Sequence, residues 1–269
     1  FFWWLQMRSF SYVDPQTGSM ISMGAVVLIF WLLSPFLLKA GYFQNVGMWV
    51  FIGNGFVHPL FSMYLAFEAT KRMGPTISAT ISAVAPLFAA AGAALTLGET
   101  ITFHILMGTV GTVIGIMVLS WNRQGAVKWA LPSLMFPIGA AIIRGANHNI
   151  GKFGLQLLPS PYFAALVSFT VSFSGALLIY YYRVRTLPLN IPKGGLIWSG
   201  LSGLCIATGV LAMYSALSSG LVSIVSPIVA TFPLFTLIIG LVFRQETLNL
   251  RLFIGVIMVV GCVVWISIQ

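Results

Sequence analysis

Long apolar runs recur along the whole chain and constrain its fold more than any other feature. Each is about 20 residues long, the length that an α-helix needs to cross a bilayer. They cover residues 20–38, 46–69, 75–97, 103–121, 129–150, 161–182, 194–217, 221–243 and 249–268. Hydrocarbon offers the backbone no hydrogen-bond partner, and the apolarity is continuous rather than alternating. The runs therefore predict membrane-spanning helices and not the strands of a barrel.

The composition argues against a water-soluble protein. Hydrophobic residues make up 59% of the 269 residues and charged residues only 6%, too few to cover a soluble domain. The net charge of +9 comes from lysines and arginines dispersed over short loops, unlike the basic patch of a nucleic-acid-binding protein. Cys205 and Cys262 lie alone in apolar runs and form neither a metal motif nor a disulfide framework. We expect no nucleic acid, no metal and no cofactor.

The chain contains an internal repeat. Glu99 and Glu246 are 147 positions apart, and this offset carries Pro86-Leu87-Phe88 onto Pro233-Leu234-Phe235 without a gap. The same offset matches Ala69 with Ala216, Thr100 with Thr247, and Gly108 with Gly255. Proline, glutamate and glycine are not filler residues in apolar sequence. The match therefore indicates a duplication, with halves at residues 1–125 and 126–269.

The first half shows one apolar run fewer than the second. Pro15 matches Pro161 at an offset of 146, which sets Phe1 against Asn147, deep within the run 129–150. We therefore expect an all-α, polytopic membrane protein of two five-helix repeats in which helix 1 is truncated, leaving about nine full transmembrane helices. An odd number of crossings inverts each successive copy, and inverted repeats are a hallmark of secondary transporters.

The paired motifs follow one order in both halves. The first copy has Tyr64-Leu65-Ala66-Phe67-Glu68-Ala69, Pro86-Leu87-Phe88, Gly98-Glu99-Thr100 and Gly108 with Gly111 and Gly115. The second has Tyr214-Ser215-Ala216-Leu217, Pro233-Leu234-Phe235, Glu246-Thr247, Gly255 and Gly261. In this order the chain resembles the EamA-like transporters of the drug/metabolite transporter superfamily. Gln245 departs from the family pattern, which has glycine before the second glutamate.

This resemblance implies a transporter and not an enzyme. The expected partners are the lipid bilayer and a small-molecule substrate, which the resemblance does not identify. We expect a multi-pass protein of the cell's inner (plasma) membrane.

Polar side chains at membrane depth are costly and therefore mark candidate binding positions. Arg144, Asn147 and His148 have the spacing i, i+3, i+4, which places them on one helical face. Pro132 and Pro137 precede them, so we expect this helix to be kinked or partly opened.

A second set of polar residues lies in the first half. Asn54, His58 and Ser62 have the spacing i, i+4, i+8 and are expected on one face of the run 46–69. Further candidates within apolar runs are Ser78, Ser82 and Thr231.

These residues favour a central polar cavity for a small polar, anionic metabolite. Arg144 would bind the anionic group, and His58 and His148 would form hydrogen bonds or carry protons. Structural alternatives exist: Arg144 can extend toward an interface, His58 can cap a helix carbonyl beside Pro59, and hydroxyl groups can serve helix packing.

The acidic residues give little support for a carboxylate-based proton site. Asp14 lies in the first loop, and Glu68 has the spacing to pair with the basic residues that follow it. Glu99 and Glu246 precede the runs 103–121 and 249–268, where a carboxylate stabilises a helix N-terminus. We therefore expect both glutamates to be structural caps.

Small residues predict close helix contacts. Gly111 and Gly115 form a GxxxG spacing, which lets two helix backbones approach each other. The contact is expected either within the chain or in a homodimer through the glycine-rich helices 103–121 and 249–268.

The distribution of basic residues predicts the orientation. Ten residues fall on one side of the membrane: Arg8, Lys71, Arg72, Arg123, Lys128, Arg183, Arg185, Lys193, Arg244 and Arg251. Lys39 and Lys152 fall on the other. The positive-inside rule then places the C-terminus outside, whereas the family resemblance implies both termini inside.

Two other classes remain as alternatives. An intramembrane enzyme acting on a lipid-like substrate would use His58, His148 and Arg144, although the chain has no HExxH or GxSxG motif. The other alternative is a channel.

Overall fold

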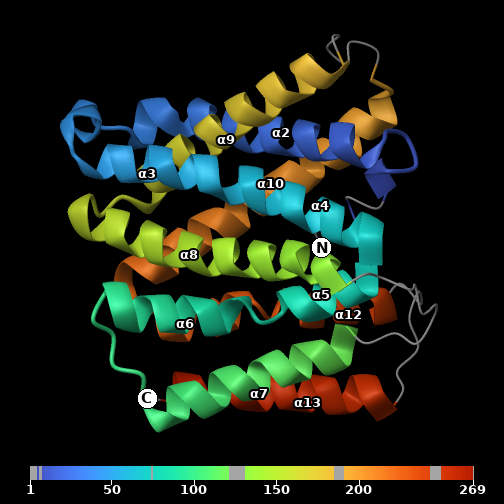
Figure 1. Ribbon diagram of the computed structural model, residues 1–269. Helices are drawn as coiled ribbons and strands as arrows, with labels where there is room; N and C mark the ends of the chain where they lie inside the picture. Colours follow the sequence, from blue (N-terminus) through green and yellow to red (C-terminus); the bar gives the residue numbers. More distant parts are fainter. Residues whose placement is uncertain are drawn as a thin grey trace. The chain divides into compact units, whose positions relative to one another are not determined.

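The computed structural model describes residues 5, 8–73, 75–120, 131–184, 191–242 and 250–268, and their regular structure is entirely helical (Figure 1). Six helical segments in these ranges, some of them interrupted, are long and apolar enough to cross a membrane: Thr17–Leu37, Gly47–Met73, Pro161–Tyr182, Lys193–Ser219, Val222–Ile239 and Leu250–Ser267. The shorter apolar helices are Thr80–Thr96 and Phe103–Leu119. The predicted polytopic helical fold is confirmed. The predicted breaks around Arg123 and Glu246 lie outside the described residues.

The chain forms two compact units. Unit 1 comprises Phe1–Leu60 and Gly151–Ser218, and unit 2 comprises Phe61–Ile150 and Ser219–Gln269. Each unit therefore takes segments from both predicted halves.

Unit 1 is built around α9 (Pro161–Val184), which packs against α2 (Pro15–Leu37) and α3 (Gly47–Gly55). It also contains the short helix η1 (Ala40–Gln44) and α10 (Lys193–Ser219). Phe163 of α9 is fully buried, and its ring packs against the rings of Tyr42, Phe43 and Phe51. Aromatic pairs of this kind add specific packing to the area that they bury.

Unit 2 shows the duplication in its helices. The first copy supplies α5 (Pro75–Ser82), α6 (Ala85–Thr96) and α7 (Phe103–Ser120). The second supplies α11 (Val222–Val229), α12 (Phe232–Val242) and α13 (Leu250–Ser267). The 147-residue offset carries the first residue of each helix in one set onto the first residue of its counterpart. The repeat found in the sequence is therefore a structural repeat.

The predicted spans 75–97 and 221–243 are both interrupted, and at equivalent positions. The interruptions fall at Ala83–Val84 and at Ala230–Thr231, just before helices whose second residue is Pro86 or Pro233. Proline has no N–H to donate and suits the first turn of a helix, so it starts a new helix more readily than it continues one.

The glycines of α7 lie against α13, which runs beside it (Figure 1). A Cβ on Gly115 would lie 3.0 Å from the backbone nitrogen of Val259, and one on Gly108 would lie 2.8 Å from Cδ1 of Ile266. Gly111 faces the sulfur of Cys262. These contacts support the alternative in which the glycines pack helices within the chain.

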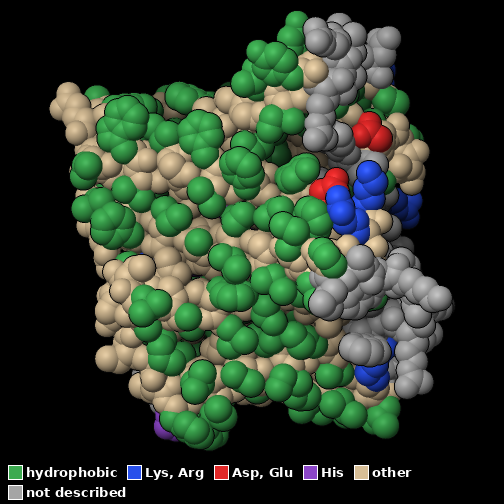
Figure 2. Space-filling view, in the orientation of Figure 1, with side chains coloured by type: hydrophobic (Ala, Val, Ile, Leu, Met, Phe, Trp, Pro, Cys, Tyr) green, Lys and Arg blue, Asp and Glu red, His purple; other side chains and the backbone are tan. Residues whose placement is uncertain are grey.

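Hydrophobic side chains cover most of the visible face of α6 and α7 (Figure 2). Leu95 and Phe103 are 86% and 70% exposed. Such side chains suit a surface that faces lipid tails.

The run 46–69 is not one regular helix. Between α3 and α4 (Ser62–Met73) lies the π-helical segment η2 (Phe56–Phe61), in which His58 has extended backbone angles, φ −141° and ψ 133°. Pro59 disfavours helical angles in the residue before it and cannot donate to the carbonyl ladder. The prediction that Asn54, His58 and Ser62 share one helical face is therefore wrong.

Candidate functional site

The polar face of α8 (Met135–Leu157) is the centre of the candidate site. Pro132 lies in the preceding turn, η3 (Leu131–Leu134), and Pro137 lies in the first turn of α8. The stretch that carries Arg144, Asn147 and His148 is uninterrupted α-helix, and the irregular part of the predicted span lies before it, in the 3-10 turn η3 that contains Pro132. Regular geometry keeps the three side chains on one face, as predicted.

His148 is held by a serine of α11. Its Nδ1 and the Oγ of Ser226 share a hydrogen bond of 2.9 Å, in which the tautomer of the imidazole decides the donor. The two residues are 5% and 2% exposed. A buried imidazole with one nitrogen fixed in this way has a defined orientation, and its Nε2 makes no hydrogen bond with the described part of the chain.

Arg144 has no counter-ion within the described residues. Its side chain is half-buried, and it makes neither a hydrogen bond nor an ion pair with that part of the chain. The ion pair that the described residues do contain joins Arg72 to Glu68 at 3.1 Å, on the surface of α4. A cation withdrawn from water is costly unless an anion or several acceptors join it. Arg144 is therefore suited to an anionic ligand.

Close packing with α6 fixes the position of this face. A Cβ on Gly145 would lie 2.8 Å from the backbone nitrogen of Ala89 and 3.0 Å from the oxygen of Ala85. One turn later, Nδ2 of Asn149 donates to the oxygen of Ala89 at 3.0 Å and to that of Gly145 at 3.1 Å. Helices α6 and α8 run side by side (Figure 1).

Other predicted residues of unit 2 use their hydroxyl groups within the protein. Ser82 donates to the oxygen of Pro137 at 3.4 Å, and Thr231 donates to the oxygen of Ile228 at 2.7 Å. Ser62 and Ser78 are each 4% exposed. The Ser82 bond reaches another segment, as the helix-packing alternative predicts, whereas the Thr231 bond is local and lies at the interruption that follows α11.

Asn54 belongs to a polar cluster in unit 1. Its Nδ2 donates to the hydroxyl of Tyr214 at 3.0 Å, and that hydroxyl lies 3.5 Å from Oγ of Ser168, to which it donates. Ser168 in turn donates to the oxygen of Phe51 at 3.1 Å. Asn54 is fully buried, whereas His58 is half-buried. Sequence reasoning missed Tyr214 and Ser168 because the order of residues does not reveal which helices face each other.

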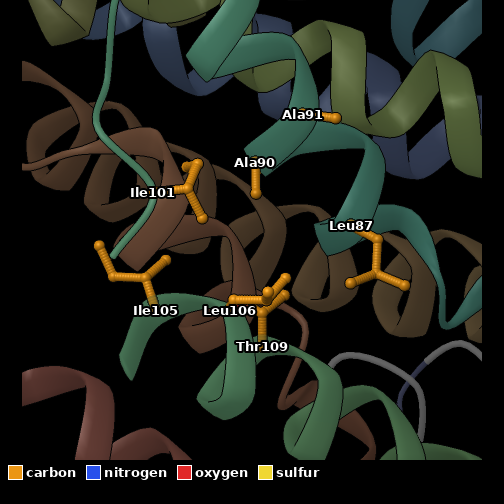
Figure 3. Close-up of a pocket in the computed structure, with 7 residues that line it drawn as sticks. All are labelled: Leu87, Ala90, Ala91, Ile101, Ile105, Leu106 and Thr109. Carbon is orange, nitrogen blue, oxygen red and sulfur yellow. The ribbon is translucent and has the colours of Figure 1, made fainter. Parts of the chain in front are cut away.

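A pocket of about 310 Å³ lies between α6 and α7 in unit 2 (Figure 3). It is lined by Leu87, Ala90, Ala91, Ile101, Ile105, Leu106 and Thr109. The hydroxyl of Thr109 is the one polar side-chain group in this lining, and none of the predicted site residues contributes to it. The pocket is therefore not the predicted polar cavity.

The described ranges contain no group of three or more His, Cys, Asp or Glu residues that could hold a metal ion. What these ranges do contain is a set of apolar membrane helices, a duplicated pair of interrupted helices and a buried polar face. This combination is typical of membrane transporters with internal repeats.

Comparison with known families agrees. The EamA-like transporter family model matches residues 1–121 and 131–268, so the chain belongs to the EamA-like transporter family. It is a multi-pass integral membrane protein of a family that transports metabolites. One solved crystal structure, described only as that of a protein, shares 16% sequence identity with this chain and has a TM-score of 0.78 to it. The match covers 98% of this chain and 91% of the other chain. This likeness shows the fold. No curated protein matches the chain significantly.

Proposed function

We propose that the protein is a secondary transporter that moves a small, polar, anionic metabolite by alternating access. The observation that carries this proposal is Arg144, a half-buried cation with no counter-ion among the described residues. Its guanidinium would bind a carboxylate or phosphate group of the substrate, because its planar fork matches the geometry of both.

The interrupted helices support a binding site in unit 2. In transporters with inverted repeats, helices broken at corresponding positions of the two halves form the substrate site. Here α5–α6 and α11–α12 are the corresponding pair, and α11 carries Ser226, the partner of His148. Ala83, at the first interruption, is buried in one hydrophobic cluster with Leu234 of α12, and Ala230 packs against that cluster.

The predicted site residues take different roles in this proposal. Arg144, Asn147 and His148 contact the substrate directly. Ser82 and Thr231 support the helices of unit 2, since their hydroxyl groups already bind within the chain. Asn54 has a supporting role of the same kind within unit 1. His58 and Ser62 stay predictions.

The halves 1–125 and 126–269 are proposed as the two repeats, inverted in the plasma membrane with the basic side in the cytoplasm. Lys152 supports this orientation because its Nζ donates to the oxygen of Leu217 at 2.8 Å, so it caps α10 rather than contributing a loop charge. A C-terminal reporter fusion that is active only in the cytoplasm would contradict the orientation. A homodimer through α7 and α13 would need surfaces other than those of Gly108, Gly111, Gly115 and Gly255, because these four glycines already pack within the helix pair.

The decisive experiment for the function is counterflow in proteoliposomes with a panel of metabolites. Vesicles preloaded with an unlabelled compound take up its labelled form only if a carrier exchanges them. We expect saturable counterflow for one or more carboxylates or phosphates, and none for cations of similar size. Large unitary currents would instead identify a channel, and product formation without a gradient would identify an enzyme.

A further inference from the structure

Glu99 lies outside the polar face of α8, in the turn between α6 and α7. The turn is fixed locally: the backbone nitrogens of Leu97 and Glu99 donate to the oxygen of Ala93 at 3.0 Å and 3.2 Å. Gly98 has φ +68°, a left-handed angle that glycine adopts without strain, and nothing lies within 4 Å of where its Cβ would be. Glycine is needed here for its backbone angle, which turns the chain and presents Glu99.

The carboxylate of Glu99 caps the N-terminus of α11, 123 residues further along the chain. Its Oε1 accepts the N–H of Val222 at 2.7 Å, and its Oε2 accepts both the N–H and the hydroxyl of Ser223, at 2.9 Å and 2.6 Å. Leu221, the N-cap residue of α11, supplies no side-chain cap. An anion at this end satisfies orphan N–H groups and interacts favourably with the helix dipole.

This contact corrects the sequence prediction, in which Glu99 caps the helix that follows it. That helix, α7, begins at Phe103, and its first turn is capped by Thr102, whose Oγ1 accepts the N–H of Ile105 at 3.3 Å. Glu99 is a cap, but of a helix from the other half of the sequence. The corresponding Glu246 lies outside the described residues.

The capped helix is short, and one turn connects the cap to the candidate site. Helix α11 has eight residues, and Pro227 removes one of its few N–H donors. Ser226 lies three and four positions after Ser223 and Val222, so it follows them on the same face. Its Oγ makes the 2.9 Å contact with His148. A hydrogen bond weakens steeply with length and angle, so a small shift of α11 would break this contact.

We infer that Glu99 is a positioning residue of the transport site: by anchoring the N-terminus of α11, it sets where Ser226 meets His148 and thereby orients the imidazole beside Arg144. This inference rests on the proposed function for its transport consequence. The structural coupling from Glu99 to His148 can be tested without any measurement of transport.

Histidine ¹⁵N NMR tests the coupling directly, because the full chain contains three histidines. The purified protein in nanodiscs gives signals for His58, His104 and His148, which single His→Gln variants assign. The Ser226→Ala variant serves as a reference, because it shows the Nδ1 signal of His148 when the hydrogen bond with Ser226 is absent. We expect Glu99→Gln, which removes the charge and one acceptor oxygen, to move the His148 signal toward that reference. The other two histidines should keep their signals.

Glu68→Gln is the matched control, since it makes the same chemical change in the surface pair with Arg72 and should leave His148 unchanged. If Glu99→Gln does not fold, Ser223→Ala replaces it, because it removes only the hydroxyl contact with Oε2 and should give a smaller shift in the same direction. An unchanged His148 signal in the folded variant overturns the inference. So does an equal shift of all three histidines, which would indicate general loosening.

Counterflow adds a functional readout with the anionic metabolite that the panel identifies. Glu99→Gln should raise KM by roughly tenfold, the effect of about one lost hydrogen bond, while the maximal rate is retained. A fall in maximal rate with unchanged KM contradicts the positioning role. If the wild-type protein exchanges no metabolite, the proposed function fails while the NMR result still decides the coupling.

Discussion

Gly145 of α8 and Ala89 of α6 are in backbone contact: a Cβ added to Gly145 would lie 2.8 Å from the nitrogen of Ala89. Arg144 directly precedes Gly145 in the sequence, and His148 follows Gly145 by less than one helical turn. The distance between these two helices therefore helps to set where the polar face lies.

Gly145→Ala is expected to destabilise the protein by about 1–3 kcal/mol, because the added methyl meets backbone atoms that no rotamer change can move. Gly261→Ala is the matched control, since nothing lies within 4 Å of its Cβ position and alanine favours the helix by about 0.5–1 kcal/mol. Melting temperatures in detergent should therefore move in opposite directions. Equal melting temperatures would show that α6 and α8 are not in close contact.

Tyr214→Phe is expected to destabilise unit 1 by about 1–3 kcal/mol, since it leaves the fully buried amide of Asn54 without its hydrogen-bond partner. Tyr181→Phe removes a hydroxyl from a ring that is 50% exposed and should change little. Thermal unfolding of both variants checks the difference. Stability unchanged by Tyr214→Phe would mean that the hydroxyl does not hold Asn54.

Lys152→Met tests the cap at the end of α10. Nζ of Lys152 donates to the oxygens of Leu217 and Ser218, at 2.8 Å and 3.4 Å. A hydrogen bond from a charged donor contributes about 1.5–3 kcal/mol to the free energy of unfolding, so the variant should melt at a lower temperature than the wild type. Lys39→Met makes the same change at an exposed position and should melt like the wild type. Similar losses in both variants would contradict the cap.

The transmembrane spans and the duplication could be predicted from the sequence because both depend on strong signals. A span needs about 20 apolar residues whatever its neighbours are. The duplication is marked by proline, glutamate and glycine, which apolar sequence does not supply by chance. The interruption at His58 was missed even though Pro59 is visible. Transmembrane helices often tolerate proline, so packing decides where a helix breaks.

The candidate site was only partly predictable. The shared face of Arg144, Asn147 and His148 follows from helical spacing alone. Ser226, the partner of His148, is 78 residues away, and Glu99 caps a helix from the other half. Such pairings depend on which helices meet in space, which periodicity does not encode.

Arg144 is proposed to bind the anionic group of the substrate, and counterflow with Arg144→Gln measures this role. Arg72→Gln is the control, because it removes an equal charge from the surface pair with Glu68. A charge-assisted hydrogen bond is worth about 1.5–3 kcal/mol, so Arg144→Gln should raise KM for the anion roughly tenfold to a hundredfold. Arg72→Gln should exchange the anion like the wild type. A folded Arg144→Gln protein with wild-type KM and rate would rule out this role for Arg144.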